Sequence, residues 1–474
     1  MNQRQQLLEQ IRRESIQKRA QALREAAQRQ AFNVPIAGAV SGGGDNRTQY
    51  WIQTLFAPES FNRQIYLQSL TMDSSGAVYS LSNPNPDSGA ALLTRKFSNS
   101  GSLVWQYPVE AAGYQTSDSI NPAKTLIYEG HLYSLYSTII TKQTLSGDLV
   151  WQSSWNADTG EGDVFTFAGF TVDLMGNLVV ISTSNDATFV HSVSAMTGQV
   201  TKTVNVSIDV TPDRYFDAQP VIDSEGNIIV ACNWVFPDYH STIIKIDPTL
   251  TTVLSTFTMD ENAFVGDCDV TALALDENDI LYVVQYDMSM YALDTRTNEV
   301  LWTRQYDSFG NNAYHMTIAP TGEIYWVGEA DWNDFGGDDG RNVVTIIKLD
   351  QSGNLDWATG IRYVPINDDF EVTGWESGSG TSGVQIVKDA LLITAEVQLV
   401  GPDTETILKL PLTQVLGTYG DYEFFDITGQ ISFTSPPPAE IPVIALATTA
   451  SNPTPIDYTP LPFALEQTKI IDKI

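Results

Sequence analysis

The feature that most constrains this sequence of 474 residues is an internal repeat of roughly 45–55 residues, built from strand and turn signals. Asp, Gly and Asn in the turns accept the positive φ angles of tight hairpins, and the β-branched and aromatic residues between them suit buried strands. The turn and the strand that follows it occur seven times, in residues 73–79, 128–133, 173–179, 223–229, 276–282, 320–325 and 387–392. Seven such copies predict an all-β, seven-bladed β-propeller.

A second turn leads to a final strand in each copy. Four copies, residues 100–105, 146–151, 297–302 and 352–357, end this motif in Trp, and two, residues 197–200 and 250–253, lack the indole. A further final strand around Trp51 has no blade in front of it. Because a ring must close without an open edge, we expect strand 47–56 to complete the last blade of a propeller spanning 47–433, with Trp51 beside residues 421–427.

The N-terminal residues 1–32 predict an α-helical arm, because they contain no Gly or Pro and are rich in helix-forming residues. Residues 1–31 hold seven Lys or Arg against three Glu, a net charge of +4 in a chain whose net charge is −32. Apolar residues recur along the arm and form a stripe that needs a partner. The predicted partner-binding residues are Leu8, Ile11, Arg12, Arg13, Ile16 and Leu23. A solvated arm is the alternative.

Two further segments flank the predicted propeller. Residues 33–46 include three consecutive glycines and predict a flexible linker. Residues 434–474 predict an extended C-terminal tail, because eight of the 22 prolines fall between Ser435 and Pro462. The run from Ile441 to Leu446 is too apolar for a purely solvated segment, so the tail is expected to lie along a surface.

The composition narrows the classes of partner. A net charge of −32 disfavours nucleic acid and anionic membranes, which carry the same sign. No apolar run is long enough for a membrane span, and the first residues do not resemble a signal peptide, so we expect neither. The only two cysteines, Cys232 and Cys268, are too few for a disulfide scaffold.

Residues 292–302, Ala-Leu-Asp-Thr-Arg-Thr-Asn-Glu-Val-Leu-Trp, resemble the tryptophan-docking, PQQ-like repeat of propellers from quinone-dependent alcohol dehydrogenases and from an outer-membrane assembly lipoprotein. Weaker forms of the repeat cover about residues 68–426. The resemblance implies the architecture and not the chemistry. The quinone enzymes place two adjacent cysteines against the cofactor, whereas Cys232 and Cys268 are 36 positions apart, so no quinone site is expected.

The sequence carries no motif for other chemistry, so no catalytic residue, cofactor or metal ligand is predicted, and the chain is expected not to be an enzyme. The four histidines fall on different repeats, and neither a nucleophile elbow nor a phosphate-binding loop is present. An alternative is a glycan-binding or glycan-cleaving propeller. Its candidate ligand loop, which could also take Ca²⁺ through oxygen ligands, holds Trp332, Asp334, Asp338 and Asp339.

Three functional classes therefore remain. The preferred class is a structural or interaction protein that contacts other subunits of a larger assembly through its arm and tail. In overall character the chain looks like a virion protein of a tailed bacteriophage, from the tail, baseplate or fibre attachment region, and it is expected in the virion after assembly in the host cytoplasm. The alternatives are the glycan module and a bacterial PQQ-like scaffold protein, although the sequence lacks the lipoprotein's signal and lipidated cysteine.

Overall fold

The structure is a computed structural model of the whole chain. It describes residues 31–35, 50–56, 66–83, 92–109, 123–136, 139–154, 166–184, 187–206, 214–215, 218–234, 240–260, 270–285, 289–307, 313–331, 342–363, 370–372, 383–397, 404–419 and 422–435. The predicted helical arm, residues 1–30 of it, and the predicted tail beyond residue 435 lie outside the described residues.

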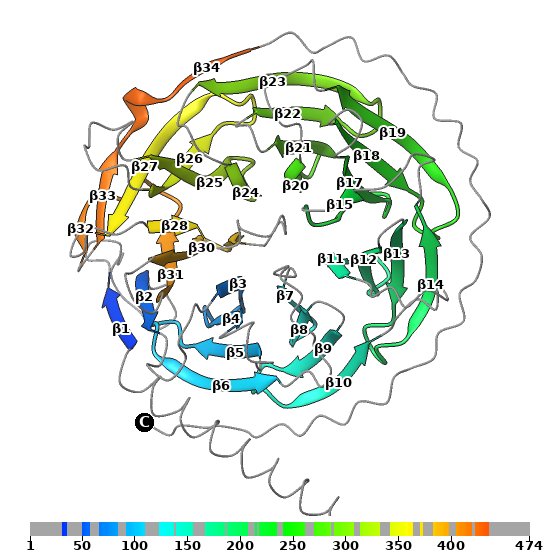
Figure 1. Cartoon of the computed structure of the whole chain (residues 1–474), viewed down its shortest axis with the longest axis horizontal. Coiled ribbons are helices and arrows are strands. Elements are labelled where there is room, and N and C mark those ends of the chain that lie inside the picture. The colour runs from blue at the N-terminus through cyan, green and yellow to red at the C-terminus, as the bar shows by residue number, and fades with distance from the viewer. Residues whose placement is uncertain are drawn as a thin grey trace, which may run out of the picture.

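Seven antiparallel sheets stand around a common centre and form the predicted all-β, seven-bladed propeller (Figure 1). Blades 1 to 3 follow the chain from the innermost strand to the outermost strand. Blade 1 is β3 (Tyr66–Met72), β4 (Val78–Asn83), β5 (Leu92–Phe97) and β6 (Leu103–Val109). Blade 2 is β7 (Ala123–Tyr128), β8 (His131–Tyr136), β9 (Ile139–Thr144) and β10 (Leu149–Ser154). Blade 3 is β11 (Thr166–Val172), β12 (Leu178–Ser184), β13 (Ala187–Val193) and β14 (Val200–Asn205).

Blades 4 to 6 follow the same order, with an inner strand of blade 4 that is split in two. Blade 4 is β15 (Arg214–Tyr215), β16 (Val221–Ile222), β17 (Ile228–Trp234), β18 (His240–Ile246) and β19 (Val253–Asp260). Blade 5 is β20 (Val270–Leu275), β21 (Ile280–Gln285), β22 (Ser289–Asp294) and β23 (Glu299–Asp307). Blade 6 is β24 (Ala313–Ile318), β25 (Ile324–Asp331), β26 (Asn342–Leu349) and β27 (Leu355–Tyr363).

Blade 7 joins the two ends of the propeller sequence. It contains β28 (Phe370–Val372), β29 (Val384–Val387), β30 (Ala390–Val397) and β31 (Thr404–Pro411), and its fourth strand is β2 (Trp51–Phe56) from the start of the chain. Trp51 is paired with Lys409 of β31. The expectation that Trp51 lies beside residues 421–427 is therefore wrong, because those residues belong to another blade.

Segments outside the four-strand plan cover the outer edges of three consecutive blades. β1 (Ala31–Pro35) pairs with β2 on blade 7. β32 (Gly417–Tyr419) and β33 (Tyr422–Asp426) follow blade 7, and β33 pairs with β27 on blade 6. A 3₁₀ turn, η4 (Thr428–Gln430), leads to β34 (Ser432–Thr434), which pairs with β23 on blade 5. These added strands supply hydrogen-bond partners to outer edges that would otherwise be open.

β1 also corrects the predicted boundaries. The sequence predicts the helical arm to include residues 31–32 and the flexible linker to include residues 33–35, but all five residues form a strand on β2. The physical reason is the open edge of β2, whose backbone groups on one side are paired by β31 and on the other side need a partner. Local helix propensity at residues 31–32 gives way to this pairing.

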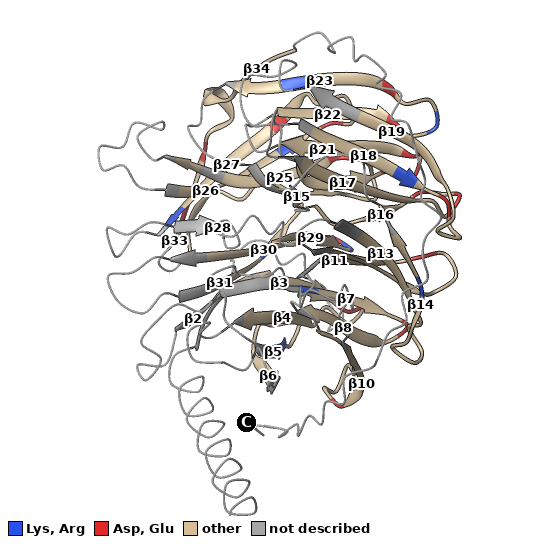
Figure 2. Cartoon of the chain, turned by 45° about the vertical axis from the view of Figure 1, so that its right-hand side comes forward, with Lys and Arg blue, Asp and Glu red and all other residues tan. Residues whose placement is uncertain are grey.

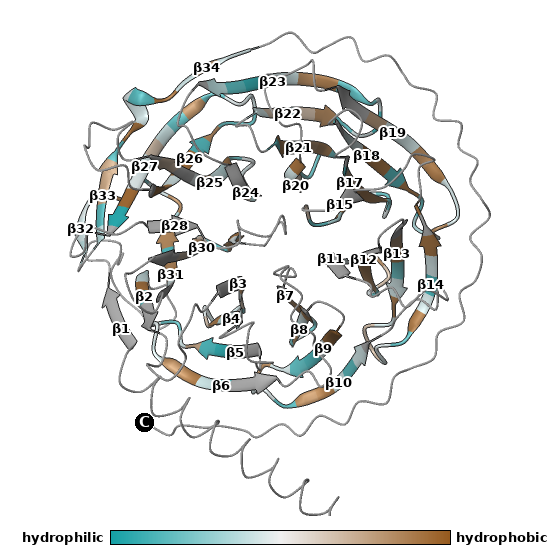
Figure 3. Ribbon diagram, in the orientation of Figure 1, coloured by the Kyte–Doolittle hydropathy of each residue, from teal (hydrophilic) through white to brown (hydrophobic). Residues whose placement is uncertain are grey.

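The core lies between neighbouring blades and forms a chain of apolar clusters around the ring. Two of the largest buried side chains illustrate this: Trp326 of blade 6 packs in one cluster with Tyr282 of blade 5. Hydrophobic and hydrophilic segments alternate along the outer strands β10, β14 and β23 (Figure 3). Successive side chains of a strand point to opposite faces, so the hydrophobic ones can pack against a neighbouring blade while the hydrophilic ones face solvent.

Candidate functional site

Side chains of one blade donate hydrogen bonds to the backbone of a turn in the next blade, and these bonds fix the position of the surface turns. In blade 2, Tyr133 Oη, Lys142 Nζ and Trp151 Nε1 all donate to the backbone oxygen of Ala195 in blade 3, at 3.2, 3.0 and 3.2 Å. Tyr133 and Trp151 also pack edge to face, with ring centroids 6.0 Å apart. Three donors from three strands thus hold one turn of the next blade.

The same device closes the ring between blade 7 and blade 1. Trp51 Nε1 donates to the backbone oxygen of Asn99 at 3.0 Å. Lys409 Nζ donates to the backbone oxygen of Gly76 and to Asn99 Oδ1, both at 2.8 Å. Lys409 is fully buried, and burial lowers its pKa to about 8. Trp51 of β2 therefore attaches blade 7 to blade 1, as Trp151 attaches blade 2 to blade 3.

The acidic residues of the repeated turns are engaged in forming those turns. In the first turn of four blades and the second turn of blade 6, an Asp accepts hydrogen bonds through Oδ1 from the backbone N–H groups two and four residues later, over 2.8–3.1 Å. These residues are Asp73, Asp173, Asp223, Asp276 and Asp350. The φ of +87° at Gly76, where a Cβ would meet Asn99 Oδ1 at 2.5 Å, explains the glycine of this turn.

Electrostatics agree with this structural role. Burial raises the pKa of Asp73, but hydrogen bonds from Ser75 and Tyr79 outweigh it, and the pKa lies below its ordinary value. Asp223 behaves in the same way and also pairs with Lys245 at 2.8 Å. Figure 2 shows acidic residues at the strand ends that carry the turns. Within the described ranges, no group of three or more His, Cys, Asp or Glu side chains is arranged to hold a metal ion.

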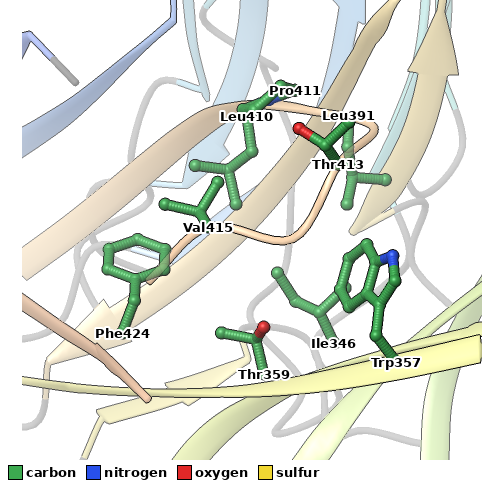
Figure 4. Close-up of a pocket in the computed structure, with 9 residues that line it drawn as sticks. All are labelled: Ile346, Trp357, Thr359, Leu391, Leu410, Pro411, Thr413, Val415 and Phe424. Atoms are coloured by element: carbon green, nitrogen blue, oxygen red, sulfur yellow. The ribbon is translucent and has the colours of Figure 1, made fainter. Parts of the chain in front are cut away.

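The described pockets are too small for a substrate. A narrow pocket of about 10 Å³ lies between blades 6 and 7 and is lined mainly by apolar side chains, among them Trp357, Leu391 and Phe424 (Figure 4). A second pocket of about 10 Å³ lies beside Phe257, between blades 4 and 5. Ligand sites for small molecules usually enclose about 300–1,000 Å³. Both pockets are packing defects between blades.

The turns at the β11–β12 and β13–β14 hairpins of blade 3 are different. Leu174 and Met175 at the first hairpin are 68% and 69% exposed, and Met196 at the second is 79% exposed. We call these three residues the blade 3 apolar turns. Single exposed apolar residues are ordinary, but three large ones at neighbouring turns of one blade ask for an explanation.

The other blades provide an internal comparison, because they carry polar or small residues at the matching positions. The counterparts of Leu174 and Met175 are Ser74 and Ser75, Ser224 and Glu225, Glu277 and Asn278, and Pro320 and Thr321. The counterparts of Met196 are Ser100, Ser146, Thr249, Arg296 and Ser352. The turn fold therefore does not require apolar side chains here, and blade 3 departs from its own repeat.

The neighbouring turns add negative charge to the blade 3 apolar turns. Exposed Glu129 occupies the corresponding turn of blade 2, and exposed Glu225 that of blade 4. Leu174 lies toward blade 4, since a Cβ on Gly226 would be 3.3 Å from its Cδ1. A complementary surface would thus combine an apolar centre with positive flanks.

The predicted site residues are not tested by this structure. Leu8, Ile11, Arg12, Arg13, Ile16 and Leu23 of the predicted arm lie outside the described residues, as do Trp332, Asp334, Asp338 and Asp339 of the predicted ligand loop. The blade 3 apolar turns were missed. The signal for Leu174 and Met175 is the residue pair between Asp173 and Gly176, and the signal for Met196 is its place in the second turn, where the other copies carry Ser, Thr or Arg.

Comparisons with known proteins leave the family open. No family model matches the chain, and no curated protein matches it. Among solved structures, the chain is similar to a protein of unknown function from Bacteroides caccae, with a TM-score of 0.39 and 14% sequence identity, over 56% of this chain and 89% of that chain. A similarity at this level carries no argument, and the fold rests on the sheet topology described above. Among the described residues, no helix has the length and apolar character needed to span a membrane.

Proposed function

We propose that this protein is a non-enzymatic interaction and assembly protein that binds other protein subunits. The observation that carries the proposal is the exposure of Leu174, Met175 and Met196 at turns whose counterparts in the other blades are polar or small. Binding would bury this apolar surface, at about 25 cal/mol per Å², on a scaffold that needs no rearrangement. A rigid turn face suits a docking part because little conformational entropy is lost on binding.

The more specific proposal is a structural component of a tailed-phage virion, in the tail, baseplate or fibre attachment region. It is supported by the sequence, which places a basic arm of net charge +4 and an apolar, Pro-rich tail at the two ends of an acidic body. The arm and the tail are further proposed contacts with neighbouring subunits. The glycan alternative depends on the loop that holds Trp332, and the described residues offer no separate observation in its favour.

The test exchanges turn residues between blades within the full chain. Leu174→Ser with Met175→Glu installs the blade 4 turn in blade 3, and Met196→Arg installs the blade 5 residue. We expect the triple variant to melt like the wild type, since the three side chains are exposed, but to be depleted at least about tenfold from purified native particles, which corresponds to a loss of about 1.4 kcal/mol in binding.

Particle content is measured by quantitative mass spectrometry. The matched control is Ser74→Glu in blade 1, which places the blade 5 residue at an exposed position of the same kind of turn and is expected to leave incorporation unchanged. Normal incorporation of the triple variant, or absence of the wild-type chain from particles, contradicts the proposal. Release of reducing ends from a polysaccharide panel, with or without Ca²⁺, favours the glycan-cleaving alternative instead.

A further inference from the structure

The turns of blades 2 to 4 surround the blade 3 apolar turns with charge of one sign. These six turns are residues 128–131, 144–148, 173–177, 194–199, 223–227 and 247–252. Together they hold six Asp or Glu residues and no Lys or Arg. The turns of blades 5 and 7 differ, because they carry the exposed cations Arg296 and Lys388. The arc of blades 2 to 4 therefore combines acidic turns with apolar side chains at its middle.

Contacts between neighbouring turns place two exposed carboxylates beside the apolar side chains. On the side of blade 4, Leu174 Cδ1 lies 3.3 Å from the place of a Cβ on the glycine that follows Glu225. On the side of blade 2, Tyr128 Oη lies 2.8 Å from the place of a Cβ on Gly176, and the residue after Tyr128 is Glu129. Glu129 and Glu225 are both exposed. We call these two residues the flanking carboxylates.

Lysines of the same blades are engaged in the junctions of the ring. Lys142, Lys202 and Lys245 each donate to a backbone oxygen of the next blade. Lys142 and Lys245 are each 9% exposed, so a partner on the surface cannot displace them easily. Burial lowers the pKa of Lys142 and the charge of Glu129 opposes this shift, so Lys142 compensates that carboxylate in part. The six carboxylates still outnumber the three lysines, and the surface remains acidic.

A partner that covers the apolar turns also comes close to the flanking carboxylates. An apolar partner would remove water from these carboxylates without replacing it, which is unfavourable, and an acidic or phosphate-bearing partner would be repelled. Lys or Arg side chains beside the apolar contact would instead pair with the carboxylates. An amphipathic helix with an apolar stripe bordered by Lys or Arg offers both features on one segment, and flexible Met side chains adapt to such a stripe.

We propose that the blade 3 apolar turns and the flanking carboxylates bind a basic amphipathic helix of a different protein subunit. This rests on the proposed function, because it names the chemistry of the partner at the same surface. Apolar side chains of the helix pack on Leu174, Met175 and Met196, and its Lys or Arg side chains pair with Glu129 and Glu225. The apolar contact supplies most of the affinity, and the charges favour encounter and orientation.

Peptide binding to the purified full chain tests this chemistry. The probe is a fluorescein-labelled helical peptide of about 20 Leu, Ala and Lys residues, about 30 Å long, with leucines along one face. Two reference peptides replace every Lys by Glu or every Leu by Gln. Fluorescence anisotropy is expected to show binding of the basic amphipathic peptide and at least about tenfold weaker binding of both references. Added salt should weaken the binding, because ions screen the exposed carboxylates.

Two variants separate the apolar and the charged contributions. Leu174→Ser with Met175→Ser and Met196→Ser installs the residues of blade 1 without a change of charge, and Glu129→Gln with Glu225→Gln keeps the apolar turns. We expect the serine variant to bind the basic peptide about tenfold more weakly. The glutamine variant should bind it about threefold more weakly or less tightly still, and its binding should depend less on salt, because exposed ion pairs are weak and screened.

The matched control is Glu277→Gln with Glu299→Gln, which removes the same charge from exposed positions of blade 5 and should leave the binding unchanged. Binding that is lost in the serine and glutamine variants but kept in the control supports the proposal. Equal binding by the serine variant, or an equal loss in the control and the glutamine variant, shows general attraction to an acidic protein and overturns it. Absence of binding by the basic peptide, or equal binding of the Glu peptide, also overturns it.

The failure of this proposal can be distinguished from the failure of the proposed function. If the basic peptide does not bind but changes at blade 3 still deplete the chain from native particles, the assembly role stands and the chemistry of the partner is wrong. Size-exclusion chromatography covers one more occupant, since residues 1–31 of this chain are themselves basic. A wild type that self-associates, and a serine variant that does not, would show that a second copy occupies the surface, which overturns the assignment to a different subunit.

Discussion

At the scale of single residues, the structure separates side chains that build the ring from side chains that are free to bind. His191 of blade 3 belongs to the first kind. It is fully buried, and its ring nitrogens lie 2.7 Å from Ser182 Oγ and 2.9 Å from Thr203 Oγ1. Burial lowers the pKa of His191 to about 3, because a charged imidazole would lose its hydration.

This gives a pH dependence with a defined sign. The unfolded chain takes up a proton at His191 near its ordinary pKa of 6.5, whereas the folded protein does not until about pH 3. The free energy of unfolding therefore falls as the pH falls through this window. We expect His191→Gln to flatten that dependence by up to about 1.4 kcal/mol per pH unit, measured by urea unfolding between about pH 6 and about pH 4.5. Identical slopes for variant and wild type contradict this.

At the scale of elements, β2 is the strand that closes the ring. Trp51 is 1% exposed, its ring lies 6.1 Å from that of Phe97, and its Nε1 bonds to blade 1. Removing a buried Trp side chain costs about 3–5 kcal/mol. Trp302 makes the matching bond to Gln351 at 3.0 Å but is only partly buried, so it is the natural comparison.

We expect Trp51→Ala to lower the free energy of unfolding by about 3–5 kcal/mol, and Trp302→Ala to lower it less. Chemical denaturation of both variants measures the difference. The Trp51 variant should also become sensitive to proteolysis near the junction of blades 7 and 1, since that junction depends on a strand from the far end of the chain. A Trp51 variant as stable as the wild type would mean that the strand does not hold the ring closed.

The same elements show which features of the fold can be predicted from the sequence. The repeated Asp and Gly turns and the docking tryptophans predict seven blades, because each copy satisfies its own local hydrogen bonds, as Asp73 and Asp173 do. The partner of Trp51 was misassigned because β33 reads as an ordinary blade strand. Nothing local distinguishes a fifth strand on blade 6 from a last strand in blade 7, since the difference is a non-local pairing.

The candidate site was missed for a related reason. The residues that fix the backbone conformation of this turn, Asp173 and Gly176, are the same as in blades 1 and 4. Leu174 and Met175 lie between them, where the fold accepts almost any side chain. A position on which folding places little constraint is where an apolar residue is most informative about binding.

At the scale of the whole molecule, the chain is a ring in which turn follows turn around one face, each held by the preceding blade. Such a face keeps its shape when it binds, and the apolar turns of blade 3 break its sevenfold regularity. A partner that recognises them therefore binds at one blade and in one orientation. This is a property that an assembly part needs and that a symmetric polar disc lacks.

The most direct test of this account is a cryo-electron microscopy structure of the native particle with the propeller resolved. The account predicts that Leu174, Met175 and Met196 lie at an interface with another protein subunit and lose most of the 68–79% exposure they have in the isolated chain. A structure in which the propeller contacts its neighbours through other surfaces, while these three side chains remain in solvent, would contradict it.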